Sequence, residues 1–430
     1  MASQGAVASH RQPPPHRMLL FIALCSISVA MMLTAFIWWG AEWSRTPPGG
    51  FSVRGSHIYD PSGRDFIAHG VNISGPGWVW SRDPTRDADL IGEAGWRFNL
   101  VRINSCILAE PTCVGYAKVQ TVTADAIVNA FTRRHIVVVF EAHDRTGGYF
   151  TDRDLDALAQ WHRALARRYR DNPYVWFEVM NEPDANCSSC AGTYPNRIQW
   201  DVTHQTVVRA IRDDAAAPNI IVVEGTSWGQ DAGTRDAEPV HDPESALLSS
   251  FPQDLLAFGG RHYGNIVASI HLYEQWNAGE TRLADYLDRA IAVNNLPVII
   301  GEYGSFNEQD TTSATQAMFA VTRPRGVGRI VWAWDGGDKN DLTTGDNPGG
   351  GWQINDREHP TNLTWLGRQV WDDNHAQGAN GGRDAGATRS GSLPPLTPPV
   401  LGNAALWPPR SRPQGRRGMS LPASPPPGSR

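Results

Sequence analysis

The chain has little of several features that would assign it to a common functional class. Five cysteines in 430 residues are too few for a disulfide framework, and a formal charge of −6 gives no indication of nucleic-acid binding. No G-x-G-x-x-G or G-x-x-x-x-G-K-[ST] motif follows a predicted strand, so nucleotide binding has no support. The sequence also lacks H-E-x-x-H, zinc-type Cys/His spacing and internal repeats. We therefore expect no nucleic-acid partner, no cofactor and no metal.

One long run is apolar and uncharged, and it covers residues 18–39. At about 1.5 Å per residue this run is long enough for a roughly 30 Å bilayer core. A cleaved signal peptide is the alternative, but its apolar region is usually about 7–15 residues. The run ends in Trp38-Trp39, which is typical of an interfacial anchor rather than a cleavage site. We predict a transmembrane signal-anchor.

The flanking charges predict the orientation of that anchor. Arg11 and Arg17 precede the run, whereas Glu42 and Arg45 follow it and cancel. Residues 1–17 are then a disordered cytoplasmic tail, and the remainder is extracellular, periplasmic or lumenal, or secreted if the anchor is cleaved. Residues 40–50 are predicted to form a stem. Residues 378–430 are rich in Pro, Gly, Ser and Arg and are predicted to be a disordered tail, which leaves residues 51–377 as one domain.

Eight strand-like segments alternate with helical patterns in this domain, which predicts βα units and a parallel sheet. Most segments are rich in Val and Ile without alternation, as expected for strands covered on both faces. Eight such units predict a (β/α)8 TIM barrel, with a doubly wound sheet as the alternative. A hairpin is expected around the turn Asp60–Gly63. The predicted strands are Phe66–Ile73, Phe98–Asn104, Ile136–His143, Val175–Asn181, Ile220–Glu224, Ile266–Tyr273, Val298–Glu302 and Arg329–Trp334.

A glutamate stands at the end of the fourth and of the seventh predicted strand. Glu182 follows the fourth strand, and Glu302 ends the seventh. Catalytic groups of a parallel barrel lie at the carboxyl ends of its strands. A pair of carboxylates there is the minimum for glycoside hydrolysis, although each glutamate alone has a structural explanation as a paired or capping group.

The segment Asn181-Glu182-Pro183 resembles the Asn-Glu-Pro signature of glycoside hydrolase family 5, the cellulase and mannanase family. Glu302, in Ile300–Gly304, is similar to the seventh-strand nucleophile of that family. Five further strand-end residues match in the same order: Arg102, His143, His271, Tyr273 and Trp332. The resemblance covers about residues 51–375.

The resemblance implies a role for each matched residue. Glu182 is expected to be the acid/base and Glu302 the nucleophile, with Asn181 holding the sugar 2-hydroxyl. Arg102 and Tyr273 are expected to orient Glu302 and keep it ionised, and His271 to contact Glu182 or substrate. His143 and Trp332 would line the subsite next to the cleaved bond. A group of aromatic residues near strand ends is expected to include further sugar contacts, with Trp334 among the predicted substrate-binding residues: Trp78, Trp80, Tyr149, Trp228, Trp276 and Trp334.

Four of the five cysteines form two close pairs in loops next to the predicted site. Cys187 and Cys190 follow Glu182, and Cys106 and Cys113 follow the second strand. A disulfide within each pair is expected outside the cytoplasm, with pairing across the loops as the alternative.

The implied substrate is a β-1,4-linked polysaccharide. Residues 138–147 resemble the third-strand segment of bacterial mannanases, whereas Pro183 departs from them. We expect a monomeric endo-β-1,4-mannanase, with an endo-β-1,4-glucanase as the nearest alternative. Two further alternatives are a transglycosylase and a non-catalytic, membrane-tethered carbohydrate-binding barrel. A non-catalytic barrel would usually lack one of the two carboxylates.

Overall fold

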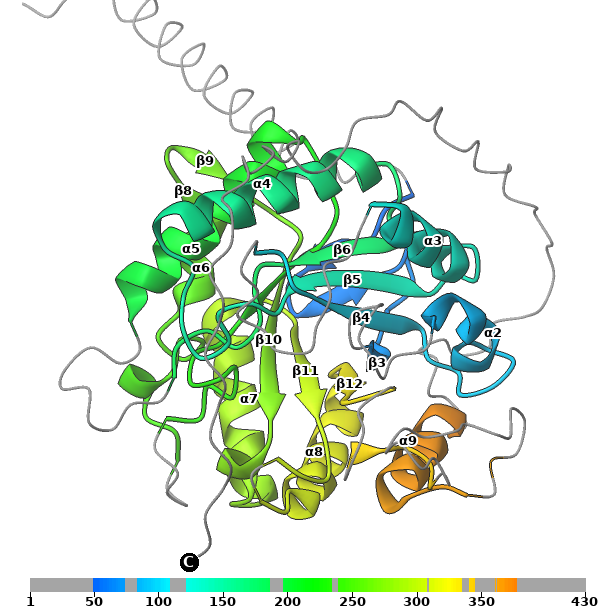
Figure 1. Ribbon diagram of the computed structural model, residues 1–430. Helices are drawn as coiled ribbons and strands as arrows, with labels where there is room; N and C mark the ends of the chain where they lie inside the picture. Colours follow the sequence, from blue (N-terminus) through cyan, green and yellow to red (C-terminus); the bar gives the residue numbers. More distant parts are fainter. Residues whose placement is uncertain are drawn as a thin grey trace, which may run out of the picture. The chain divides into compact units, whose positions relative to one another are not determined.

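The computed structural model describes residues 49–73, 83–108, 121–185, 196–233, 239–307, 309–334, 340–344, 360 and 362–376. Eight parallel strands form a closed barrel in the order β3-β4-β5-β6-β7-β10-β11-β12, and β12 pairs with β3. Helices surround the barrel (Figure 1). The predicted (β/α)8 fold is confirmed, and the closure of the barrel excludes the doubly wound open sheet.

Each barrel strand overlaps one of the predicted segments, and all of their residues are buried, as expected for a sheet covered on both faces. The first, fourth and eighth strands are each three residues shorter than predicted. Beyond the fourth, the Asn181 N–H still donates to the Ala142 carbonyl (2.9 Å), so Asn181 stays on the barrel rim. The strands are β3 His69–Ile73, β4 Leu100–Ser105, β5 Val137–Ala142, β6 Val175–Glu178, β7 Ile221–Glu224, β10 Ile266–Leu272, β11 Val298–Tyr303 and β12 Arg329–Val331.

The helices follow the amphipathic patterns in the sequence. In α4, Leu158, Trp161 and Leu165 are buried on one face, and the helix ends before Asn172-Pro173. The last helix begins at Trp365 because Thr364 caps it, accepting from the Gly367 N–H at 2.9 Å. The α-helices are α2 Ala88–Ile91, α3 Thr121–Thr132, α4 Asp152–Tyr169, α5 Arg197–Arg209, α6 Phe251–Leu256, α7 Glu280–Asn294, α8 Thr312–Arg325 and α9 Trp365–His375. Shorter elements are η1 Pro84–Arg86, η2 Ala210–Asp214, η3 Asp242–Glu244, η4 Glu274–Trp276 and the strand pair β8 Ala257–Phe258 and β9 Arg261–His262.

A hairpin precedes the barrel, but its turn differs from the prediction. β1 (Ser52–Arg54) pairs with β2 (His57–Tyr59), and the chain reverses at Gly55, whose φ of 57° is accessible to glycine without strain. The expected turn at Asp60–Gly63 is also present, and it is followed by a single bridge between Tyr59 and Asp65.

The hairpin closes one end of the barrel. The Phe51 ring contacts Phe66, Tyr174 and Trp176 edge-on, with ring centroids 5.1–5.2 Å apart. These aromatic side chains pack with residues near the start of the strands, among them Leu100. The amino-terminal end of the barrel is therefore filled with apolar side chains, and any chemistry is confined to the carboxyl ends of the strands.

Several predictions lie outside the described residues: the anchor over residues 18–39, both terminal tails, most of the stem, and Cys113, Cys187 and Cys190. Among the described residues, no helix is both long and apolar enough to cross a membrane. Cys106 is buried and disulfide-bonded, while its predicted pairing with Cys113 stays a prediction.

Candidate active site

The barrel interior holds one guanidinium among several carboxylates. Arg102, on β4, is fully buried. It donates through Nε to Glu178 Oε2 (2.6 Å), through Nη1 to Glu302 Oε1 (2.7 Å) and through Nη2 to Asn181 Oδ1 (2.9 Å). Three further oxygen-bearing side chains surround it: Asn72 at 2.9 Å, Glu224 at 3.4 Å and Glu141 at 3.9 Å.

One guanidinium does not compensate so many buried acids. Burial raises the pKa of Glu178 and of Glu224 to about 8, even though Arg102 lowers both values. Burial opposes the charge of Arg102 as well, but Glu178, Glu141 and Glu302 outweigh it, so the pKa of Arg102 is well above its usual value. The cluster therefore holds some of its carboxyl groups protonated near neutral pH.

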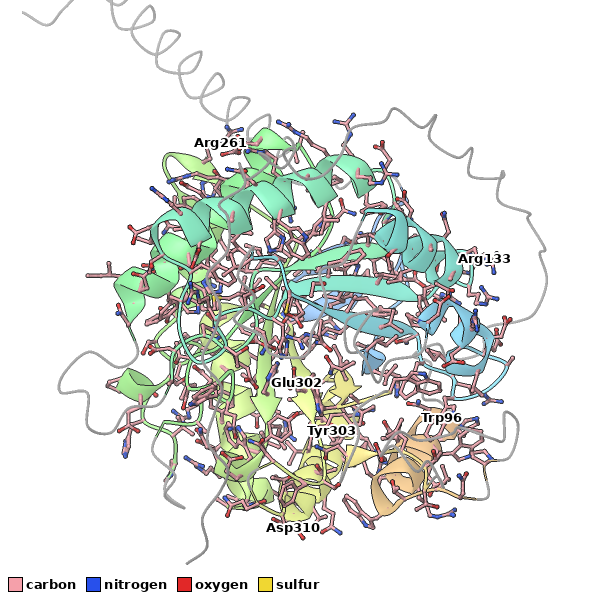
Figure 2. The ribbon with its side chains drawn as sticks, in the orientation of Figure 1. Trp96, Arg133, Arg261, Glu302, Tyr303 and Asp310 are labelled. Carbon is pink, nitrogen blue, oxygen red and sulfur yellow. The ribbon has the colours of Figure 1, made fainter. Side chains whose placement is uncertain are left out.

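Glu182 and Glu302 meet at the carboxyl ends of β6 and β11. A carboxylate oxygen of each, together with a ring nitrogen of His271, lies within 4.8 Å of the other two. His271 Nδ1 is 2.8 Å from Glu182 Oε1, and the Tyr273 hydroxyl donates to Glu302 Oε2 at 3.0 Å. Figure 2 shows Glu302 among the strands at the centre of the barrel, whereas Arg133 lies at the periphery.

The two glutamates have different surroundings. Burial raises the pKa of Glu182 to about 7; the His271 hydrogen bond lowers it, and the charges of Glu302 and Glu224 raise it. Glu302 instead accepts hydrogen bonds from Arg102 and Tyr273. Burial raises the pKa of the Tyr273 hydroxyl well above its usual value. Glu182 is thus placed to carry a proton near neutral pH, beside a carboxylate that is held by a cation and a neutral hydroxyl.

Asn181 and the predicted subsite residues also lie at this end of the barrel. Asn181 accepts from Arg102 and donates through Nδ2 to Thr146 Oγ1 at 3.1 Å. His143 Nδ1 is 2.8 Å from Glu141 Oε1, and its ring stacks on Trp332 with centroids 5.9 Å apart. Burial opposes protonation of His143, but Glu141 outweighs it and raises the pKa.

Trp334 does not fit its predicted role as a substrate contact. Its side chain is 1% exposed and donates its indole N–H to Asp87 Oδ2 at 3.1 Å. Trp96 and Phe98 pack against the ring edge-on. A ring enclosed in this way offers no face to a sugar, so Trp334 is a packing residue between the barrel and α2.

The other aromatic candidates divide by exposure. Trp276 is 1% exposed and is therefore also a packing residue. Trp228 is 40% exposed, and a side chain on Gly147 would collide with its ring. The Gly147 N–H in turn donates to the Glu182 carbonyl (2.7 Å), which places the Trp228 ring beside the Glu182 segment. Tyr149 is half-buried. Trp78 and Trp80 lie outside the described residues.

Sequence reasoning missed the inner polar layer of the site, which consists of Asn72, Asn104, Glu141, Glu178 and Glu224. All five are essentially fully buried. A signal was present, because each interrupts an otherwise apolar strand, where an unpaired polar group is costly. The sequence did not show that one arginine on β4 contacts four of them, namely Asn72, Glu141, Glu178 and Glu224.

Two groups of side chains in the described part of the chain have ligand-type atoms close together: Glu178, Glu224 and His271, and Glu182, His271 and Glu302. Arg102 already contacts Glu178, Glu224 and Glu302. A metal ion in either group would face the guanidinium at short range, which is electrostatically unfavourable.

The sequence of the barrel also matches a known protein family. The family model for cellulase (glycosyl hydrolase family 5) matches residues 59–338, more than half of the chain. The chain belongs to glycosyl hydrolase family 5. The matched segment contains both glutamates and every predicted site residue.

Proteins with sequences similar to this chain are named either as mannan endo-1,4-beta-mannosidases or as endoglucanases. A mannan endo-1,4-beta-mannosidase from Cellvibrio japonicus is 26% identical over 306 residues, which are 70% of this chain and 63% of that protein. Endoglucanase A from Butyrivibrio fibrisolvens is 24% identical over 267 residues, 60% of this chain and 52% of that protein. A crystal structure of beta-mannanase from Streptomyces thermolilacinus has a TM-score of 0.57 at 22% identity, covering 75% of this chain and 94% of that one. This last similarity supports the fold.

We predict that Arg102→Met lowers the free energy of unfolding by about 3–5 kcal/mol, because it leaves buried carboxylates without their cation. The loss of stability should be larger at pH 8 than at pH 5. Without Arg102, the pKa values of the buried carboxyl groups rise further in the folded protein, whereas in the unfolded chain they stay near 4.5. Above pH 4.5 the unfolded chain is therefore favoured increasingly as the pH rises. Urea unfolding at the two pH values measures this.

Arg163→Met is the matched control, since Arg163 pairs with Asp214 at the surface, where both side chains are more than one third exposed. A change of about 1 kcal/mol or less is expected for it at both pH values. Equal, small losses for the two variants would contradict the central role of Arg102.

Proposed function

We propose that the protein is a retaining glycoside hydrolase that cleaves internal bonds of a β-1,4-linked mannan. The observation that carries the proposal is the placement of Glu182 and Glu302, with carboxylate oxygens within 4.8 Å of each other. Retaining glycosidases have carboxyl groups about 5–5.5 Å apart, whereas inverting enzymes need about 6.5–9.5 Å to admit a water molecule. A double displacement fits this spacing.

In the first step, Glu182 donates its proton to the glycosidic oxygen while a Glu302 oxygen attacks the anomeric carbon. The bond between that carbon and the leaving oxygen breaks, and a glycosyl ester forms on Glu302. In the second step, ionised Glu182 takes a proton from water, the water oxygen attacks the anomeric carbon, and the ester bond breaks. Arg102 and Tyr273 hold Glu302 in position by their hydrogen bonds throughout.

The remaining site residues have supporting roles in this proposal. Asn181, fixed between Arg102 and Thr146, holds the 2-hydroxyl of the sugar that is attacked. The stacked pair of His143 and Trp332 borders the same sugar. Trp228, exposed beside the Glu182 segment, offers an aromatic face to the leaving part of the polymer.

Mannan is favoured by residues 138–147, which resemble the third strand of bacterial mannanases, and by relatives named mannan endo-1,4-beta-mannosidase. A β-1,4-glucan is the second candidate. Pro183 and the relatives named endoglucanase favour it. The presence of both carboxylates argues against a non-catalytic carbohydrate-binding barrel.

Glu302→Gln is predicted to lower release of reducing ends by at least about 10⁴-fold, because the amide is not a competent nucleophile. The assay uses mannan, glucomannan, carboxymethyl cellulose and xylan, with product sizes measured with and without an acceptor sugar. Glu280→Gln, an exposed change at the start of α7, is the control and should match the wild type. Wild-type rates in Glu302→Gln would refute the proposal, and longer products with the acceptor would identify transglycosylation.

The pKa of Glu182 predicts the alkaline limit of activity. Since this pKa is raised to about 7, the acid form is present below that pH and is lost above it. We expect kcat/KM for the polysaccharide to fall tenfold per pH unit above about pH 7. A 2,4-dinitrophenyl glycoside, which leaves without protonation, should show little of this fall. A decline that starts near pH 5, or identical profiles for both substrates, would be inconsistent with this assignment.

We also propose that the domain acts outside the cytoplasm, tethered by residues 18–39. The disulfide-bonded Cys106 supports an oxidising compartment, and we expect its partner to be Cys113. The full chain should pellet with membranes and require detergent for release, and the released protein should elute as a monomer. A soluble form that begins near residue 40 would show that the segment is cleaved.

A further inference from the structure

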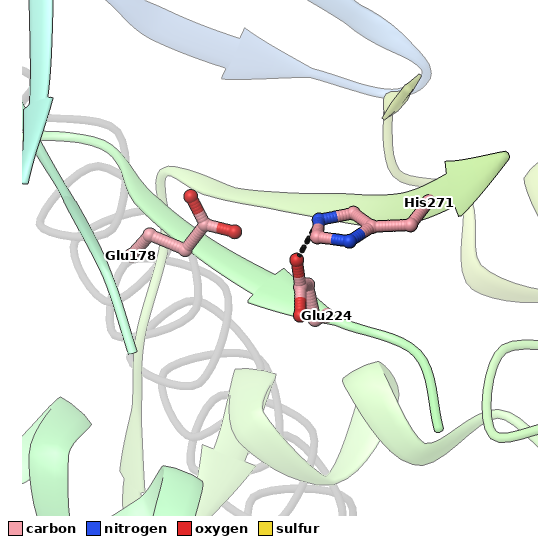
Figure 3. A group of neighbouring side chains, drawn as sticks. All are labelled: Glu178, Glu224 and His271. Atoms are coloured by element: carbon pink, nitrogen blue, oxygen red, sulfur yellow. Dashed lines mark ion pairs between the residues drawn. The ribbon is translucent and has the colours of Figure 1, made fainter. Parts of the chain in front are cut away.

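Glu224 contacts the Glu182 segment in a way that the double displacement does not explain. It lies at the end of β7 and is fully buried. Its Oε2 accepts the backbone N–H of Glu182, and its Oε1 contacts His271 Nε2. The other ring nitrogen of His271 lies 2.8 Å from Glu182 Oε1. Figure 3 shows the Glu224 carboxylate against the His271 ring.

Both oxygens of Glu224 are therefore connected to Glu182, one through the backbone and one through His271. The backbone contact matters because Glu182 has a φ of 45°, a region that a residue with a side chain adopts only when its surroundings hold it there. The arrangement also leaves no space beside Glu224: a side chain on Gly229 would approach both His271 and Glu224 within about 3.3 Å.

We propose that Glu224 is a positioning residue that holds Glu182 in the conformation needed for general acid catalysis. The inference rests on the proposed function, in which Glu182 is the acid. Glu224 does not touch the reacting atoms; it acts through His271 and through the Glu182 backbone.

The contact through His271 holds the Glu182 side chain. The His271 ring lies between the two carboxyl groups, with Nε2 against Glu224 Oε1 and Nδ1 2.8 Å from Glu182 Oε1. Glu224 therefore fixes the ring that contacts the acid, while its other oxygen fixes the Glu182 backbone.

A glutamine at position 224 cannot keep both contacts, because an amide has only one accepting oxygen. With that oxygen toward the Glu182 N–H, an amide nitrogen replaces the oxygen beside His271 Nε2. With the amide reversed, its nitrogen faces the Glu182 N–H. Either orientation displaces Glu182 from its position, although the side-chain volume is unchanged.

Glu178 provides a matched comparison. It is an equally buried glutamate in the same cluster, with both oxygens accepting from Arg102 at 2.6 and 3.1 Å. Through these short bonds to Arg102 it is connected to Glu302, the proposed nucleophile, more closely than Glu224 is, since Glu224 lies 3.4 Å from the guanidinium. Glu178 also hydrogen-bonds Glu224. A substitution there should affect every substrate, because all of them require the nucleophile.

The test compares kcat/KM for the polysaccharide with kcat/KM for 2,4-dinitrophenyl β-mannobioside, or β-cellobioside if glucan is preferred. The second substrate needs no acid in the step that kcat/KM reports. Glu224→Gln should lower the polysaccharide value about 10–100-fold and the aryl glycoside value less than about 3-fold, a magnitude typical of a general acid or its supporting contact. Glu178→Gln should lower both by one common factor.

Glu224→Asp is the second variant, in case the amide does not fold. It keeps two accepting oxygens but withdraws them by one methylene, so a smaller loss is expected, about 3–10-fold and again confined to the polysaccharide. Equal losses on both substrates, or no loss on either, for whichever variant folds would overturn the inference. If Glu302→Gln remained active, the proposed function itself would fail, which is a separate result.

Discussion

The structure depends on the burial of Arg102 among the glutamates of the barrel interior. A charged group away from water is tolerated only with partners, and Arg102 has hydrogen bonds to Glu178, Glu302 and Asn181. These partners come from β6, β11 and the segment after β6. The guanidinium therefore ties together strands that are distant in sequence, and it fixes the orientation of the proposed nucleophile at the same time.

The surplus of buried carboxyl groups over cations also gives the two proposed catalytic glutamates different surroundings. Glu302 is held by Arg102 and Tyr273, whereas Glu182 is held by His271 and lies near the charges of Glu302 and Glu224. Burial raises the pKa of Glu182, while Glu302 is oriented by a cation and a hydroxyl, so identical side chains have the different surroundings that an acid and a nucleophile need. Cofactor chemistry is not needed for this division of roles, since burial and neighbouring charges are sufficient causes.

Much of this was predictable from the sequence, for physical reasons. Uninterrupted Val- and Ile-rich segments predicted eight covered strands, and their alternation with helical patterns predicted the barrel. Glu182 and Glu302 were found because strand ends converge at one rim. Trp334 was misassigned because proximity to a strand end does not show which way a ring faces; the ring packs against Trp96 and Phe98. Glu178 and Glu224 were missed because their shared partner is defined only by barrel closure.

The order of strands around the barrel has a consequence for the range of polymers that such a domain can accept. β6 and β11, which position the two glutamates, are separated by β7 and β10. Hydrogen-bonded neighbouring strands lie about 4.8 Å apart, so the sheet sets the span between the carboxylates. In the proposed mechanism, the anomeric configuration of the product is then a property of the sheet. Loops at the rim are free to change length and composition, and with them the sugar that is accepted, without changing that stereochemistry.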